Sequence, residues 1–457
     1  MRKSQDRLLK DQNNILSDTF IEVCRNGRTN TLVRKRKMPL EDLIYSMINR
    51  RGLTLKLELR NYMKITHPGV EISKPGYLKQ RMKLNPEAFK YLYQSHNKNF
   101  YQDPEVEPYT YNGFLVLAVD GSNINIPTTA ETVEKYGSAS VRGGKPCAQI
   151  GLGCIYDVLN RFILDSSINQ VKFDEMRIAQ EQLAGIRDTI GNRYPYMIIM
   201  DRGYPSTPAF LKFIDDGIYF VARLKSSDYK EEQNSMKSSD EDVEINLTKA
   251  RRRNYIGKKE EAIMMSRESF SLRLVKVRLN DGKSEVLATN LPRDMFPEQC
   301  FAEVYHMRWG IETAYEILKD RLKIENFTGI KPILIEQDIN STIYVSNLAE
   351  DIICDIEEDD KEHLKNDYKH TMQLNRNLSI GLLKSDLIYI LMETNAERKK
   401  DLLQALYNEI RVNVVPIRPD RHYHRTKGQL DYYGAAEPPV QCGVSHLSGL
   451  TEPQPCN

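Results

Sequence analysis

The sequence predicts an α/β fold for the middle of this 457-residue chain. Three apolar segments follow one another closely after Tyr111, and amphipathic segments then alternate with further apolar segments. Short apolar runs bounded by turn residues are typical of buried strands, whereas apolar positions at helical spacing are typical of a helix that covers a sheet. The predicted order is therefore β-β-β-α-β-α-β.

Each element of this core has its own signal. Apolar runs at 114–120, 148–158 and 161–168 predict the first three strands, and Asn160-Arg161 suits a tight turn between the second and the third. Residues 172–190 are amphipathic and predict a helix. A buried strand at 194–201, a short helix at 206–217 that ends at a glycine, and a strand at 218–225 complete the order.

The flanking segments divide the chain further. Residues 1–105 are expected to form a helical, basic, DNA-binding region, with breaks at Pro39, Pro68 and Pro75. Residues 106–225 are expected to hold the first part of the core, and residues 291–330 the rest of the core with a long helix. Between them, residues 226–290 are expected to form a β-rich insertion, in which strands at 269–279 and 284–291 are joined by a hairpin turn at Asn280-Asp281-Gly282. Residues 331–427 are expected to be helical, and 428–457, which lack Lys and Arg, a disordered tail.

Composition narrows the class of protein. The formal charge of +2 hides a strongly basic stretch near the N-terminus, which favours nucleic acid as a partner: Arg34, Lys35, Arg36, Lys37, Arg50, Arg51, Lys56, Arg60 and Lys64. Seven scattered cysteines without a C-x2-C pair indicate free thiols rather than a disulfide framework. No run approaches the ~20 apolar residues of a membrane span, and the first residues lack the apolar core of a signal peptide, so a cytoplasmic location is expected.

The segment 298–329 combines one carboxylate with phosphate-seeking side chains. Tyr305, Arg308, Glu312 and Lys319 fall within roughly 60° of one another on a helical wheel. That face suits a metal ion beside a nucleic-acid backbone, with Glu312 as an oxygen ligand. A solvated Lys/Glu-rich helix gives a similar pattern, and the periodicity alone does not separate Glu312 from Glu316 or Asp320.

Two aspartates end apolar strands at turns, Asp120 in VLAVDGS and Asp201 in MIIMDRGYPS. A charged residue at the end of a buried strand lies at the edge of the sheet, where ligands can approach. Either one alone also fits an ordinary turn. Together with Glu312 they predict three clustered carboxylates, which would share one or two Mg²⁺ ions and support phosphoryl transfer by two metal ions about 3.5–4 Å apart.

These segments and YHMRWGIETAYEILK resemble the DDE transposases of bacterial insertion sequences, in the IS-four group defined by the signature Y-x2-R-x3-E-x6-K. The resemblance covers about residues 30–425, including LATNLP before the signature and VPIRPDRHYHR near the end. It implies a ribonuclease-H-like catalytic core interrupted by a β-rich insertion, in agreement with the predicted order of elements. It also selects Glu312 over Glu316.

The resemblance implies cut-and-paste movement of a DNA element, with nicking at its terminal inverted repeats, in many cases a hairpin, and strand transfer into target DNA. Asp120, Asp201 and Glu312 would bind two catalytic Mg²⁺ ions, or Mn²⁺, while Tyr305, Arg308 and Lys319 would contact phosphates near the cleaved end. Arg202 is a further candidate phosphate contact. A homodimer on DNA is expected, with the C-terminal helices as its contact surface, in a bacterial cytoplasm at the nucleoid.

Other readings remain open. A ribonuclease-H-like nuclease without strand transfer and a catalytically inactive, transposase-derived DNA-binding protein both fit the same motifs. Arg34, Lys35, Arg36 and Lys37 are expected to bind element-end DNA, the alternative being a solvated helix start. Trp309 is expected to pack the signature helix against the sheet rather than to stack on a base. His422 and His424 lack metal-ligand partners, and no nearby His would activate Ser122.

Overall fold

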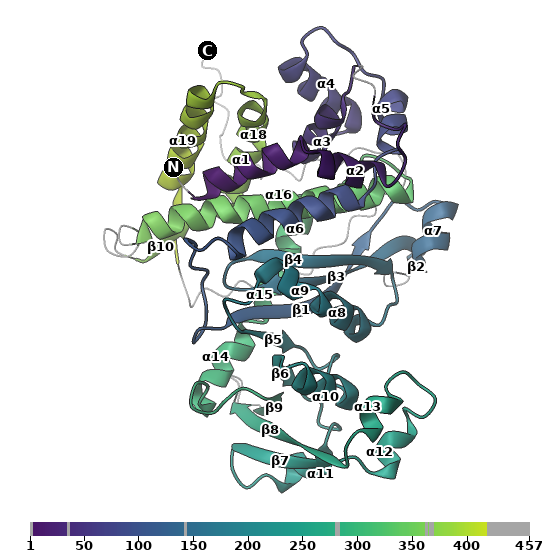
Figure 1. The fold of residues 1–457 in the computed structure, drawn as a ribbon, viewed down its shortest axis with the longest axis vertical. Coiled ribbons are helices and arrows are strands. Elements are labelled where there is room, and N and C mark those ends of the chain that lie inside the picture. Colours follow the sequence, from purple (N-terminus) through teal and green to yellow (C-terminus); the bar gives the residue numbers. More distant parts are fainter. Residues whose placement is uncertain are drawn as a thin grey trace, which may run out of the picture. The chain divides into compact units, whose positions relative to one another are not determined.

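A nine-stranded mixed sheet organises the chain (Figure 1). The computed structural model describes residues 3–33, 37–140, 144–278, 284–361, 364 and 370–417. In that part of the chain the strands of this sheet are β1 (Leu115–Asn125), β2 (Ser138–Ala139), β3 (Cys147–Asp157), β4 (Phe162–Gln170), β5 (Tyr196–Met200), β6 (Tyr219–Arg223), β7 (Asp240–Asn246), β8 (Ser269–Arg278) and β9 (Ser284–Thr289). A separate two-stranded sheet pairs β10 (Met372–Leu374) with β11 (Val414–Pro416).

The central strand β1 pairs antiparallel with β3 and parallel with β5. Beyond β3 lies β4, and beyond β5 the sheet continues with β6, β9, β8 and β7. The pairs β1–β5 and β5–β6 are parallel and the others are antiparallel. The predicted order is present as β1-β3-β4-α8-β5-α10-β6, where α8 is Glu175–Ala184 and α10 is Thr207–Asp215. A short helix, α7 (Ala130–Tyr136), and β2 are added between the first two long strands.

Helices precede, cross over and follow the sheet. Those before it are α1 (Lys3–Ile15), α2 (Asp18–Arg25), α3 (Leu40–Ile48), α4 (Leu55–Thr66), α5 (Lys74–Arg81) and α6 (Glu87–Tyr101). Those between strands are α7 (Ala130–Tyr136), α8 (Glu175–Ala184), α9 (Ile186–Ile190), α10 (Thr207–Asp215), α11 (Lys230–Ser235), α12 (Lys249–Arg253) and α13 (Glu261–Met265). After β9 come η1 (Glu298–Cys300), α14 (Phe301–His306), α15 (Trp309–Glu316), η2 (Ile317–Arg321), α16 (Pro332–Asp359), α18 (Arg376–Met392) and α19 (Ala396–Val412).

The turn between β3 and β4 forms where Asn160-Arg161 predicted it. Asp157 organises this turn, because its Oδ1 accepts hydrogen bonds from the backbone N–H of Leu159 and of Asn160, each over 3.1 Å. Arg161 adopts a left-handed conformation with φ 63°, which closes the turn into β4. The short connection keeps β3 and β4 adjacent and antiparallel.

The two faces of the sheet bury different helices. Side chains alternate between faces along a strand, so Leu115, Leu117 and Val119 of β1 share one core with residues of α8, α9 and α10. Val116 points the other way and packs with Phe301 and Val304 of α14, and Ala118 shares a core with Ile311 and Ala314 of α15. The signature segment therefore covers the face opposite to α8–α10.

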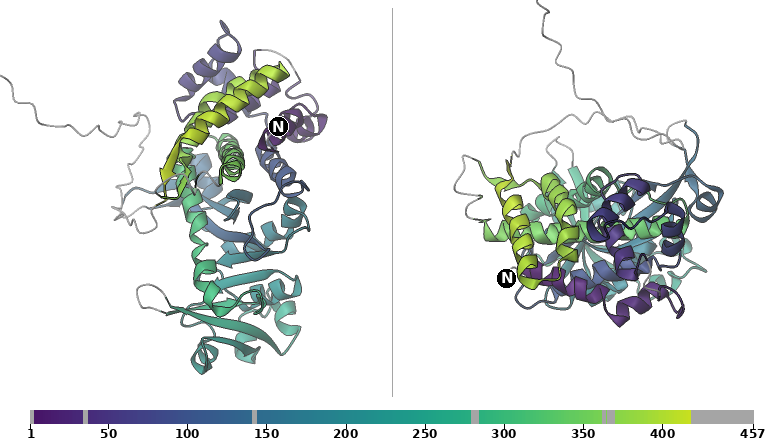
Figure 2. Two further views of the ribbon diagram at one scale, coloured as in Figure 1. Left: turned by 90° about the vertical axis from the view of Figure 1, so that its left-hand side faces the viewer. Right: turned by 90° about the horizontal axis from the view of Figure 1, so that it is seen from above.

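Buried charges join the N-terminal helices to α16. Arg7 of α1 pairs with Asp351 over 2.5 Å, and His96 of α6 lies 2.7 Å from Asp11 and 3.4 Å from Asp351. These side chains are almost completely buried, so each pair is shielded from water and its loss would leave a charge uncompensated. Figure 2 shows α16 enclosed by the N-terminal helices and by α18 and α19. Residues up to Pro416 accordingly form one compact unit.

Residues 226–290 contribute three further strands to the same sheet. Strand β9 pairs antiparallel with β6, and β8 and β7 follow it outward. The hairpin turn predicted at Asn280-Asp281-Gly282 and the tail at 428–457 lie outside the described residues. The cysteines that the structure describes are all free, as the scattered pattern predicted: Cys24, Cys147, Cys154, Cys300 and Cys354. Among the described helices, none combines the length and the apolar composition that a membrane crossing requires.

Candidate active site

The parallel pairing of β1 and β5 sets the two aspartates side by side. The register runs from Leu115 opposite Tyr196 to Ala118 opposite Ile199, and two further residues on each strand lead to Asp120 and Asp201. Alternation places Asp120 on the same face as Ala118, and Asp201 on the same face as Ile199. Both carboxylates therefore point toward the face that α14 and α15 cover.

The signature segment is not the single regular helix that its spacing predicted. Helix α14 ends at His306 and α15 begins at Trp309. In the connecting turn the backbone hydrogen bonds span three residues instead of the four of an α-helix, from Gly310 N to Met307 O and from Ile311 N to Arg308 O. The last turn, η2, is a π-helix closed by Leu322 N donating to Ile317 O. These two irregularities change the angle between successive side chains. Tyr305, Arg308, Glu312 and Lys319 therefore do not share one face as closely as the wheel of a regular helix predicted.

Helix α15 lies close to the sheet because Gly310 has no side chain. A Cβ atom at this position would lie 2.7 Å from Val158 Cγ1, at the turn between β3 and β4. Ile311 and Ala314 are buried beside it, and the Tyr315 hydroxyl lies 2.9 Å from the carbonyl oxygen of Asp120. These contacts place the first turn of α15, with Glu312, over the end of the β1–β5 pair.

Arg308 pairs with Glu312 and acts electrostatically on the two aspartates. Its Nη2 donates to Glu312 Oε1 over 3.0 Å, and its side chain is only 8% exposed. Its positive charge acts on Asp120 and Asp201 as well as on Glu312. Arg308 Nε is buried without a hydrogen-bond partner. The guanidinium is thus held among the carboxylates with part of its donor capacity unused.

The acidity of Asp120 is perturbed by its surroundings. Burial, the largest cause, and the negative charges of Glu175 and Glu312 together raise the pKa of its carboxyl to about 6, against the opposing effects of the Gly121 backbone and Arg308. A carboxylate in this setting is stabilised by any additional cation. Within the part of the chain that the structure describes, no three metal-ligating side chains lie close enough together to hold an ion.

The other signature residues have separate partners. The Tyr305 hydroxyl donates to Asp201 Oδ1 over 3.1 Å. Lys319 reaches β1 beyond Asp120, where its ammonium donates to Ser122 Oγ and to the Asn123 carbonyl, each over 2.9 Å. Burial lowers the pKa of Lys319. Tyr305 therefore positions Asp201, whereas Lys319 contacts the part of β1 that follows Asp120.

Trp309 does not have the packing role that the sequence predicted. Its side chain is 49% exposed, and the Arg308 guanidinium lies 4.9 Å from the centroid of its ring. The residues that pack this helix against the sheet are Ile311, Ala314 and Tyr315. The expectation was wrong because Trp309, as the first residue of α15, lies on the outer side of the turn after α14.

The predicted DNA-binding residues outside the signature are dispersed. Arg202 is exposed on the turn after β5. Lys37 precedes α3 and donates to the Glu71 carbonyl over 3.2 Å, away from the carboxylates. Arg34, Lys35 and Arg36 lie outside the described residues, as do His422 and His424.

Two charged residues of the site carried no usable sequence signal. Glu175 opens α8, and a Cβ atom at Gly121 would lie 3.1 Å from Glu175 Oε1. Arg223 ends β6, lies 4.0 Å from Asp201 Oδ1 and pairs with Glu285 over 2.5 Å. A polar residue at a helix start or a strand end is common, so only the three-dimensional arrangement reveals these two.

A family model identifies the class of the central part of this chain. A family model described as a transposase DDE domain matches residues 111–348, just over half of the chain. That span begins before β1 and ends within α16, so it contains Asp120, Asp201 and Glu312. No curated protein matches this sequence. A solved structure, the cryo-EM structure of the piggyBac transposase synaptic complex with hairpin DNA, is similar with a TM-score of 0.46 and 11% identity, over 87% of this chain and 84% of that chain.

Proposed function

The chain belongs to the transposase DDE-domain family, and we propose that it catalyses cut-and-paste DNA transposition as a member of the IS-four group of insertion-sequence transposases. It cleaves DNA at the terminal inverted repeats of its element and joins the ends to target DNA. The observation that supports this proposal most directly is the placement of Asp120 and Asp201 at the ends of paired parallel strands, with Arg308, which bonds to Glu312, acting electrostatically on both aspartates.

The catalytic core is ribonuclease-H-like in this proposal. Support comes from the strand order β4-β3-β1-β5-β6, in which the first three strands are antiparallel and the last two are parallel to β1. The family model covers this sheet and the signature segment in one continuous match. The remaining strands, β9, β8 and β7, extend the core at one edge.

The carboxylates fit divalent metal ions by their chemistry. Asp120, Asp201 and Glu312 offer hard oxygen donors, and Asp120 has its pKa raised, burial being the largest cause, with repulsion from Glu175 and Glu312 adding to it. Two bound Mg²⁺ ions, or Mn²⁺, would supply an activated water or hydroxyl and stabilise the leaving oxygen of the phosphodiester. Tyr305 holds Asp201 in position through its hydroxyl.

Neighbouring cations then bind the DNA backbone. Arg308 exchanges part of its contact with Glu312 for a phosphate oxygen, since its Nε has no partner in the protein. Lys319 and Arg202 contact flanking phosphates, and Arg34, Lys35, Arg36 and Lys37 bind the element end. Such contacts fix the scissile phosphate beside the carboxylates and do not read the base sequence.

Cleavage at both ends of an element needs two active sites, so the active species is a homodimer on DNA. Its contact surface is formed by α18 and α19. Leu378 and Tyr389 of α18 and Val412 of α19 are exposed large apolar residues there, which suit such a contact. The protein acts in the bacterial cytoplasm, at the nucleoid.

A cleavage assay on labelled DNA that bears the flanking inverted repeats, with Mg²⁺, tests the function. The parent protein is compared with Glu312→Gln and with Glu316→Gln, which removes the same charge one helical turn later. Metal-dependent cutting by the parent and by Glu316→Gln, but not by Glu312→Gln, is the expected result. Joined products with target DNA then separate transposition from simple nicking.

Other outcomes favour the alternative functions. Nicked DNA without joined products, across varied targets, indicates a nuclease that lacks strand transfer. Binding of the inverted repeats by the parent and both variants, without cutting at any metal concentration, indicates an inactive DNA-binding protein. The proposal is wrong in either case.

A further inference from the structure

Four basic side chains from three distant segments meet on the side of the molecule formed by the N-terminal helices. Arg50 and Arg51 lie between α3 and α4, Lys323 follows η2, and Lys384 lies in α18. The charges of Arg50, Arg51 and Lys323 all act on Lys384. We call these four residues the basic cluster.

Specific contacts hold the segments of the basic cluster together. Arg50 Nη2 donates to the Asn326 carbonyl over 2.6 Å, and Asn326 Nδ2 donates back to the Gly52 carbonyl over 2.5 Å. Arg51 Nη2 donates to the Ser385 carbonyl over 3.0 Å. A Cβ atom at Gly52 would lie 3.4 Å from Lys323 Cγ. The cluster is therefore a built feature and not a chance approach of flexible side chains.

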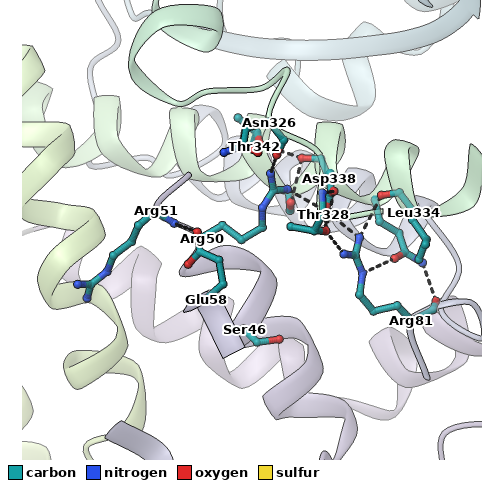
Figure 3. Close-up of polar contacts among 12 residues, drawn as sticks. Ser46, Arg50, Arg51, Glu58, Arg81, Asn326, Thr328, Leu334, Asp338 and Thr342 are labelled. Atoms are coloured by element: carbon teal, nitrogen blue, oxygen red, sulfur yellow. Dashed lines mark hydrogen bonds and ion pairs between the residues drawn. The ribbon is translucent and has the colours of Figure 1, made fainter. Parts of the chain in front are cut away.

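Arg50 anchors the cluster to the buried end of α16. Its Nη1 lies 2.8 Å from Asp338 Oδ1, and the same carboxylate pairs with Arg81 over 2.7 Å and accepts from the Thr328 hydroxyl and backbone (Figure 3). Arg81 and Asp338 are completely buried. In Figure 3 the Arg50 side chain points toward Asn326 and Asp338, whereas the Arg51 side chain points away from them. Arg50 thus has a structural role.

The other basic residues of the cluster have few carboxylates nearby to compensate their charges. Glu58 of α4 accepts the backbone N–H groups of Arg51 and Leu53 over 2.8 and 2.7 Å. The charge of Arg51 also acts on the carboxylate of Asp386. Lys384 makes no hydrogen bond or ion pair in the same part of the chain, and Arg51 Nε is buried without a partner.

The surroundings of Lys384 disfavour its charged form. Burial, the largest cause, and the charges of Arg50, Arg51 and Lys323 together lower the pKa of its ammonium to about 8, while Glu58 opposes them. Like charges held together without a partner are relieved by an anion from outside the protein. Phosphate oxygens can accept from arginine and lysine donors at the same time.

The basic cluster continues from the candidate active site. Lys319 bonds to β1 at Ser122 and Asn123, directly beyond Asp120, and Lys323 follows Lys319 by four residues. Lys323 itself is exposed. Along the chain Lys323 follows the residue that bonds next to Asp120, and its side chain lies beside Gly52 of the loop that carries Arg51.

We propose that Arg51, Lys323 and Lys384 form a phosphate-binding site for the backbone of the DNA duplex that leads away from the catalytic carboxylates. The inference rests on the proposed function for the nature of the ligand. It adds a site outside the signature, in which the loop between α3 and α4 and helix α18 hold the DNA together. The contacts are to phosphates, so they strengthen binding to any duplex sequence.

The test measures duplex DNA binding over a series of salt concentrations, without metal, for the parent, Lys323→Gln/Lys384→Gln and a control with the same charge loss, Lys237→Gln/Lys259→Gln. Lys237, before β7, and Lys259, before α13, are exposed. Two lost phosphate contacts are expected to make the slope of log K against log salt shallower by about 2, with affinity about tenfold lower, for both inverted-repeat and unrelated duplexes. The control keeps the parent slope.

Replacing single phosphates by neutral methylphosphonates locates the contact. Neutralisation of the contacted phosphates should weaken DNA binding by the parent but not by the double variant, because the double variant already lacks the interaction with those phosphates. Lys323→Gln alone gives the same test at an exposed residue, where folding is not at risk. An unchanged slope, or equal slopes in the double variant and the control, overturns the site. Cutting of inverted-repeat DNA by the parent, assayed in parallel, decides the proposed function separately.

Discussion

Arg308 Nη2 donates a hydrogen bond to Glu312 Oε1 over 3.0 Å, one helical turn along the signature segment. The pair is mostly shielded from water on the arginine side, since the Arg308 side chain is 8% exposed and that of Glu312 34%. The same guanidinium acts on Asp120 and Asp201. A protein cation thus already compensates part of the charge that metal ions would compensate.

Arg308→Gln is expected to separate metal binding from catalysis. Cleavage should fall about 10²- to 10³-fold, because a preorganised donor beside the scissile phosphate is lost. Stabilisation of the protein by Mg²⁺ should increase, because a competing cation has been removed. Single-turnover cleavage and thermal unfolding with and without Mg²⁺ measure the two effects.

Arg177→Gln is the matched control for this variant. Arg177 forms the same type of i,i+4 pair, with Glu181 over 2.6 Å, but on the exposed surface of α8. Its loss should change neither cleavage nor the response to Mg²⁺, since exposed pairs contribute only about 0.3–0.5 kcal/mol. A fall of both cleavage and metal response in Arg308→Gln would instead show that Arg308 organises the carboxylates.

Metal removal should destabilise the parent protein. At Mg²⁺ concentrations about 100-fold above its dissociation constant, binding to the folded state alone adds about 2.7 kcal/mol to the free energy of unfolding. Chelation should reverse this gain. Asp120→Asn and Asp201→Asn should abolish it, and Asp120→Asn should also make the metal-free protein more stable, because a buried charge near Glu175 and Glu312 is removed. Equal Mg²⁺ responses in parent and variants would contradict the metal site.

Tyr305→Phe tests the positioning of Asp201. The change removes a donor that lies 3.1 Å from Asp201 Oδ1 and keeps the ring in its place. Loss of one such hydrogen bond is expected to lower cleavage by roughly tenfold, with a smaller change in DNA binding. Tyr111→Phe removes a similar bond, to Glu303 over 3.0 Å on the exposed side of α14, and should leave cleavage unchanged. Equal losses in the two variants would indicate a general effect on packing of α14.

The strands and their aspartates were accessible from the sequence because the signals are local. Apolar runs that end in a charged residue identify β1 and β5, and parallel register then brings Asp120 and Asp201 together. Glu312 was favoured by its spacing from Tyr305 and Arg308 and chosen by family resemblance. The strand signals and the signature spacing each depend on residues close together in the sequence, whereas the choice of Glu312 needed the resemblance.

What the sequence did not predict depends on contacts between distant segments. The close approach of Gly310 to Val158 joins positions about 150 residues apart, and periodicity contains no information about it. Glu175 and Arg223 reach the site from helix and strand ends that look ordinary in sequence. Trp309 was expected to pack the signature helix against the sheet, but the turn at Met307 and Arg308 places it outside.

Gly310→Ala is expected to displace α15. The added Cβ would lie 2.7 Å from Val158 Cγ1, so the helix or the β3–β4 turn must shift, at a cost of about 1–3 kcal/mol in the free energy of unfolding. Because Glu312 is on the first turn of α15, cleavage should fall by more than the loss of folded protein explains. Chemical denaturation and cleavage by the folded fraction measure both effects.

Gly381→Ala is the control, since a Cβ atom at this glycine of α18 meets nothing within 4 Å. It should leave cleavage unchanged and stabilise the protein by up to about 1 kcal/mol through helix propensity. Val158→Ala combined with Gly310→Ala should recover much of the lost activity by making room for the methyl group. Failure of that rescue would show that the contact does not set the position of α15.

The lowered pKa of Lys384 predicts a specific pH dependence of stability. Burial and three neighbouring cations bring this pKa to about 8 in the folded protein, against about 10.5 in the unfolded chain. Between these values the unfolded state binds more protons, so the contribution of Lys384 to stability rises with pH. Below pH 8 the charged ammonium is a full penalty, at most about 3 kcal/mol. Lys384→Met should therefore be more stable than the parent at pH 7, and the difference should shrink as the pH rises from 8 toward 10.

Urea denaturation of the parent, Lys384→Met and Lys400→Met at several pH values measures this difference. Lys400 is exposed on α19, so its variant should keep a constant difference from the parent at every pH. Because all three proteins share the remaining titrating groups, their effects cancel in the comparison. A parent that is more stable than Lys384→Met at pH 7 would mean that an anion of the protein compensates Lys384, and the basic cluster would then have no charge left for a phosphate.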